Sequence, residues 1–94
     1  MKITERFLKY VSFDTTSDED SPSTPSTEKQ KALGAFLADE LKSIGLEEVR
    51  MDEYGYVYGY LPATEDRKND ATVGLIAHMD TSPAVSGTDI KPRI

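Results

Sequence analysis

The chain has no cysteine and fewer basic than acidic residues, and both features exclude whole classes of protein. Without cysteine there can be no disulfide scaffold, cysteine-based zinc finger or thiol nucleophile, and the composition fits a reducing compartment such as the cytoplasm. Eleven basic residues against seventeen acidic ones give a formal net charge of −6. Nucleic acid and anionic membrane surfaces both attract basic faces, so we expect neither as a partner.

Long apolar runs are also missing. No stretch approaches the roughly 18–20 apolar residues that a membrane-spanning helix needs. The first ten residues are amphipathic and include Glu5, which is not typical of a signal peptide. A length of 94 residues allows one domain, residues 1–94. We therefore expect a single acidic, soluble domain located in the cytoplasm.

Two segments have the pattern of amphipathic helices. Residues 3–13 repeat apolar side chains at helical spacing, with Thr4 or a residue before it as the cap. Thr27 and Gln30 match a capping box at the start of a second helix, and Gly45 suits its left-handed end. The apolar stripe of this second helix consists of Leu33, Phe36, Leu37, Leu41 and Ile44.

The segment between these helices, residues 14–27, has no periodicity and is rich in acidic and hydroxyl side chains. It lacks the glycine that a calcium-binding EF-hand loop requires at its sixth position. We therefore predict a solvent-exposed loop.

A hairpin and a third strand follow. Residues 47–52 and 54–61 alternate around a break at residues 52–53, which predicts an antiparallel pair. Four tyrosines at even positions 54–60 share one face, which is either covered by other elements or exposed because its cover is missing. Gly55 and Gly59 on the opposite face would let a helix approach closely. Stacking of nucleic-acid bases on the tyrosines is disfavoured by the acidity of the chain.

Residues 71–77, ATVGLIA, form a continuous apolar run that is typical of a strand buried on both faces. The sequence therefore predicts an α/β fold of three layers, in which both helices pack on a small mixed sheet. The strand at residues 71–77 is expected at the centre of that sheet.

The single histidine, His78, stands at the end of this apolar run, where ligands bind in open α/β sheets. Asp80 is two residues away, so in extended backbone both side chains project from the same face. A carboxylate beside an imidazole fixes its tautomer and raises the basicity of the free nitrogen, as around metal-bound histidines. A lone histidine is more often a structural residue, however, and one His-x-Asp pair does not complete a zinc site.

The segment at residues 73–83, VGLIAHMDTSP, resembles the first metal-ligand motif of the M20 metallopeptidase family, and in particular its tripeptide aminopeptidases. The most specific block is His-x-Asp-Thr-Ser-Pro after a hydrophobic strand. The resemblance extends over nearly the whole chain and includes residues 5–17, 25–49 and 58–64.

This resemblance implies a zinc-dependent exopeptidase with two Zn²⁺ per full-length subunit, which releases the N-terminal residue of tripeptides by metal-activated water. It implies that His78 is a metal ligand and that Asp80, which orients His78, belongs to the catalytic machinery. The family's other ligands, its general base and its lid domain have no counterpart in the chain. We therefore expect residues 1–94 to be the N-terminal part of the catalytic domain, a truncated or proteolytic piece that is inactive alone.

Two alternatives remain open. The chain could be a stand-alone acidic binding or interaction domain in which His78 is structural. It could also be a small metal carrier that uses His78 and Asp80 together with ligands from a partner.

Overall fold

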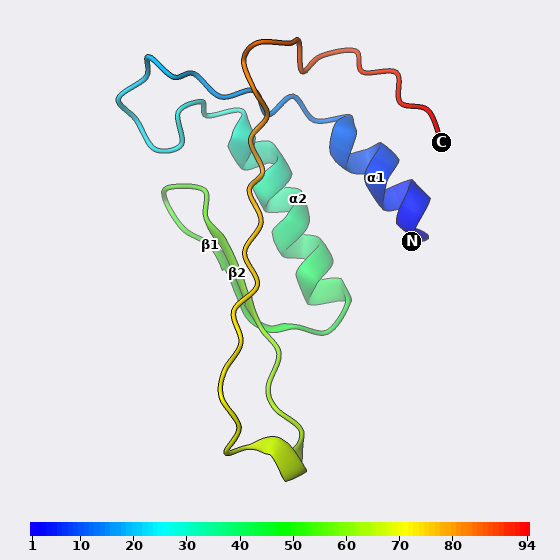
Figure 1. The fold of residues 1–94 in the computed structure, drawn as a ribbon, viewed down its shortest axis with the longest axis vertical. Coiled ribbons are helices and arrows are strands. Elements are labelled where there is room, and N and C mark those ends of the chain that lie inside the picture. The colour runs from blue at the N-terminus through cyan, green and yellow to red at the C-terminus, as the bar shows by residue number, and fades with distance from the viewer.

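A computed structural model describes all residues from 1 to 94 and contains two helices followed by a hairpin (Figure 1). The helices are α1 (Ile3–Val11) and α2 (Gln30–Ser43). The strands are β1 (Glu47–Met51) and β2 (Val57–Tyr60), and a short 3-10 turn, η1 (Glu65–Arg67), comes after them. The predicted α/β class is confirmed, although the sheet has two antiparallel strands and is not mixed.

Helix α2 ends as predicted but begins differently. At its C-terminus Gly45 has a φ of 99°, and the Leu46 N–H donates to the Leu41 carbonyl at 3.1 Å, which is the predicted left-handed stop. At its N-terminus the Gln30 side chain donates to Thr27 Oγ1 at 2.9 Å, and that hydroxyl donates to the Thr16 carbonyl at 2.8 Å. The predicted capping box is therefore replaced by a link between α2 and the preceding loop.

One face of the hairpin packs against α2. The strands pair with Arg50 opposite Tyr58 and Met51 opposite Val57. A Cβ atom on Gly59 would lie 2.8 Å from Leu46 Cδ2 and 3.3 Å from Leu41 Cδ1, so only glycine permits this approach without displacing a neighbour. The predicted glycine face is confirmed at this position. The four tyrosines from 54 to 60 are exposed.

Helix α1 packs on α2 and not on the sheet, which corrects the prediction that both helices cover the sheet. The rings of Tyr10 and Phe13 lie 6.2 Å and 5.6 Å from that of Phe36, measured between centroids. Arg6 and Tyr10 both reach Glu40 on the same side of α2. Because α2 carries Leu41 toward the sheet and Phe36 toward α1, it lies between the two, as Figure 1 shows.

Residues 71–77 do not form the predicted central strand, and this prediction is wrong for the structure. The segment has no regular secondary structure, and its Leu75 and Ile76 are 95% and 99% exposed. A central strand needs hydrogen-bonding partners at both edges and cover on both faces. The 94 residues provide neither, so the segment runs as an extended stretch from η1 toward the C-terminus (Figure 1).

The chain is consequently open. Its radius of gyration is 15.6 Å, whereas a compact domain of this length has about 12 Å. Its accessible surface is 7496 Å², against roughly 5,400 Å² expected for a folded monomer of this mass. The buried apolar residues are Leu33 and Ala38. Neither helix has the length and apolar composition required to cross a membrane.

Candidate functional site

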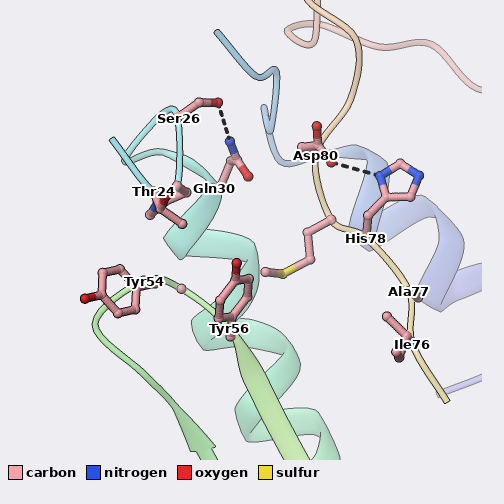
Figure 2. A pocket seen from close by; sticks show the side chains of 12 residues that line it. Thr24, Ser26, Gln30, Tyr54, Tyr56, Ile76, Ala77, His78 and Asp80 are labelled. Atoms are coloured by element: carbon pink, nitrogen blue, oxygen red, sulfur yellow. Dashed lines mark hydrogen bonds and ion pairs between the residues drawn. The ribbon is translucent and has the colours of Figure 1, made fainter. Parts of the chain in front are cut away.

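His78 and Asp80 form a hydrogen-bonded pair at the end of the extended segment. Nδ1 of His78 lies 2.9 Å from Oδ1 of Asp80, and the two side chains share one side of the backbone, as their spacing predicts (Figure 2). An ionised carboxylate can only accept a hydrogen bond, so the pairing places the imidazole proton on Nδ1. Nε2 makes no hydrogen bond within the chain, and the His78 side chain is 84% exposed.

This arrangement fits one ligand of a metal ion and does not make a complete site. A neutral imidazole whose second nitrogen is held by a carboxylate is the usual form of a zinc-binding histidine. No group of three or more histidine, aspartate or glutamate side chains comes together in the structure. The metal-binding role of His78 and the orienting role of Asp80 therefore remain predictions.

A groove of about 390 Å³ lies beside the pair. One wall is formed by residues 76–80, and the other includes Gln30, Tyr54 and Tyr56 (Figure 2). Its volume lies in the range of small-ligand sites. The sequence predicts Gln30 at a helix cap and Tyr56 on a sheet face, and no pattern in it places either residue near His78. Only their long-range packing brings them there.

The backbone that follows Asp80 is fixed to the loop after α1. The Thr81 N–H donates to the Thr15 carbonyl at 3.1 Å, and the Thr81 carbonyl accepts from the Ser17 N–H at 2.9 Å and from its hydroxyl at 3.1 Å. Thr15 is 3% exposed. The prediction of a solvent-exposed loop over residues 14–27 is therefore wrong at this end. No pattern within residues 14–17 or 80–82 indicates this pairing.

Asp14 organises this loop electrostatically. Its Oδ1 accepts hydrogen bonds from the Thr16 N–H and hydroxyl at 3.1 and 3.0 Å, and its Oδ2 lies 2.9 Å from Lys29 Nζ. The hydrogen bond from Lys29, followed by that from the Thr16 backbone, lowers the pKa of the Asp14 carboxyl below its ordinary value. Asp14 is thus ionised at neutral pH and joins the loop to Lys29, the residue that precedes α2.

Comparison with known proteins confirms the resemblance seen in the sequence. No protein-family model matches the chain. Peptidase T of Clostridium acetobutylicum is 54% identical to this chain over 92 residues. Peptidase T of Caldanaerobacter subterraneus subsp. tengcongensis is 56% identical over 93 residues. Each match covers 98–99% of this chain and 22% of the relative. Peptidase T of Parabacteroides distasonis is 50% identical over 94 residues, which is the whole chain and 23% of the relative. The chain thus spans less than a quarter of the length of the relatives that it matches, and over its full length it is similar to one part of proteins named Peptidase T.

Proposed function

We propose that residues 1–94 are the N-terminal part of the catalytic domain of a two-zinc tripeptide aminopeptidase. The observation that carries this proposal is the His78–Asp80 pair, held at 2.9 Å with Nε2 of His78 free. It occurs in a chain that is 50–56% identical to proteins named Peptidase T. The structural alternative for His78 gains no support, because a side chain that is 84% exposed contributes little to packing.

In this proposal the two residues have different tasks. His78 would hold a zinc ion through Nε2, while Asp80 accepts the Nδ1 proton and keeps the ring in the required tautomer and orientation. Zinc, when bound, polarises the peptide carbonyl and lowers the pKa of water. The remaining ligands and the general base would come from outside these residues. The 94-residue chain alone is therefore expected to hydrolyse no tripeptide.

The open surface supports the idea that the chain is part of a larger domain. It exposes roughly 2,000 Å² more than a folded monomer of its mass. Its most exposed large side chains include Leu75 and Ile76, three and two residues before His78. The net charge of −6 disfavours nucleic acid and an anionic membrane as partners. The lack of cysteine is compatible with the cytoplasm.

A chimera tests the function. Residues 1–94 would replace the matching segment of Clostridium acetobutylicum peptidase T, to which they are 54% identical. Zinc per chain and tripeptide hydrolysis would be measured for the parent chimera and for His78→Ala, Asp80→Ala and Asp80→Asn. Glu53→Gln, which changes an exposed acid that does not line the groove, serves as the matched control for charge removal.

We expect His78→Ala to abolish hydrolysis and lower the zinc content. Asp80→Ala should weaken zinc binding by about 10–100-fold, the usual effect of losing the hydrogen-bond partner of a ligand. Asp80→Asn should reduce the rate more than the zinc content, because an amide oxygen still accepts from Nδ1. Full zinc and full activity in His78→Ala would refute the proposal, as would tripeptide hydrolysis by the isolated 94-residue chain.

A further inference from the structure

The segment that carries His78 and Asp80 has very few attachments to the rest of the molecule. No backbone hydrogen bond joins any of residues 71–80 to another part of the chain. The only side-chain hydrogen bond within this stretch that involves His78 or Asp80 is the one between them. Its first fixed point is Thr81, one residue beyond Asp80, whose N–H and carbonyl both pair with the loop after α1.

Anchoring Thr81 constrains Asp80 directly. The Thr81 N–H belongs to the same planar peptide unit as the Asp80 carbonyl, so its bond to the Thr15 carbonyl sets the orientation of that plane. The two bonds that Ser17 donates to the Thr81 carbonyl fix the next plane. The backbone of Asp80 is thus oriented from its C-terminal side, and its carboxylate is held where it meets Nδ1 of His78.

The loop is in turn held by Asp14. Its carboxylate accepts both Thr16 donors and pairs with Lys29 at the start of α2, while Thr27 ties the Thr16 carbonyl to the same turn. Gly87 also packs against this carboxylate, where a Cβ atom would collide with Oδ1. The carboxylate of Asp14 therefore connects α2, the loop and the segment beyond Thr81.

We infer that Asp14 is a positioning residue for the His78–Asp80 pair, acting through the loop at residues 15–17 and Thr81. The inference rests on the proposed function in one respect, because that function explains why the His78–Asp80 pair has to be positioned. The contacts themselves exist without any metal. Losing Asp14 releases Thr16 and Lys29, loosens the Thr81 bridge and lets Asp80 turn away from His78.

The single histidine makes this testable in the zinc-free 94-residue chain. A long-range ¹H–¹⁵N correlation spectrum at mildly alkaline pH reports which ring nitrogen of His78 carries the proton. Asp80→Ala defines the ratio of tautomers for an unpaired ring. Asp14→Ala and Lys29→Met are the test variants, and Asp20→Ala is the matched control, since it removes the same charge from the same loop and its carboxylate makes no hydrogen bond.

We expect Asp14→Ala to move the tautomer ratio more than half of the way toward that of Asp80→Ala. Lys29→Met should give a smaller shift in the same direction, and Asp20→Ala none. A merely structural role of Asp14 would change amide signals of the loop and leave the ratio unchanged, and that result would overturn the inference. Should α2 unfold in Asp14→Ala, Lys29→Met decides: a shift of the tautomer ratio toward that of Asp80→Ala supports the inference, and an unchanged ratio overturns it. Because no zinc is present, a failure of zinc binding refutes the proposed function and does not touch this result.

Discussion

The attachment of α1 to α2 depends on Glu40, and replacing it provides the sharpest test of the packing. Its Oε1 lies 2.7 Å from Arg6 Nε, and its Oε2 accepts from the Tyr10 hydroxyl at 2.5 Å. The side chain of Glu40 is 9% exposed and that of Arg6 is 33% exposed. Glu40→Ala removes the acceptor of the Tyr10 hydroxyl and the charged partner of the enclosed Arg6 Nε.

The expected cost follows from these contacts. The hydrogen bond from Tyr10 to the charged Glu40 contributes about 1.5–3 kcal/mol. The ion pair between Glu40 and Arg6 adds less, because Arg6 is 33% exposed and water screens its charge. We therefore expect Glu40→Ala to weaken docking of α1 by about 2–3 kcal/mol. This corresponds to a roughly 30- to 150-fold increase in the population of the undocked helix.

Hydrogen exchange of the α1 amides, compared with those of α2, measures this population. Glu40→Gln should cost less than Glu40→Ala, because its amide oxygen still accepts from Tyr10. Glu28→Ala is the control: Glu28 pairs with Lys31 at 3.1 Å but is 77% exposed, so its loss should cost below about 0.5 kcal/mol. Unchanged exchange of α1 in Glu40→Ala, or an equal effect of Glu28→Ala, would refute the reasoning.

Three further predictions follow from other contacts. Burial, and then the hydrogen bond to Glu40, raises the pKa of Tyr10 above 10.0. The stabilisation that the protonated phenol provides is complete below pH 10.0 and is lost as pH rises through the raised pKa, so an NMR titration should show the pKa of Tyr10 moving down toward 10.0 in Glu40→Gln. The pKa of Asp14 is lowered below 3.8, so the stabilisation that its ionised carboxyl provides is present above that pH and is lost as pH falls through the lowered pKa. An NMR titration of this carboxyl should show a higher pKa in Lys29→Met than in the unchanged chain. Gly59→Val should lower stability by about 1–3 kcal/mol through contact with Leu46 and Leu41, whereas Gly74→Val, with no atom within 4 Å of its Cβ, should have little effect on the thermal midpoint.

The elements predicted correctly are those whose signals are local. The left-handed stop of α2 needs only Gly45 and its neighbours, and the hairpin needs only alternation around a short break. The His78–Asp80 pair is local as well, since extended backbone places side chains two residues apart on one face. These features could therefore be read from the sequence.

The features that the sequence did not predict all depend on distant residues. Thr81 pairs with Ser17 across 64 positions, and no pattern within either segment specifies that contact. The Thr27 hydroxyl, predicted to cap α2, donates to Thr16 because the loop folds back toward it. The position of α1 on α2 depends on Glu40, which a helical wheel assigns to the polar side.

The apolar segment before His78 shows the same dependence on distant partners and leads to a last prediction. In a buried central strand, Ile76→Thr would place a hydroxyl in the core and cost several kcal/mol. Here Ile76 is 99% exposed, so the substitution should change the stability of the chain by no more than about 0.5 kcal/mol. Leu33→Ala is the comparison, because Leu33 is 7% exposed and its truncation should cost about 2–5 kcal/mol. Chemical denaturation of both variants measures the difference.

In the peptidase T chimera Ile76→Thr should become costly, because there the rest of the domain can cover the segment. If Ile76→Thr destabilised the 94-residue chain as much as Leu33→Ala, the segment would already be buried and the open arrangement would be wrong.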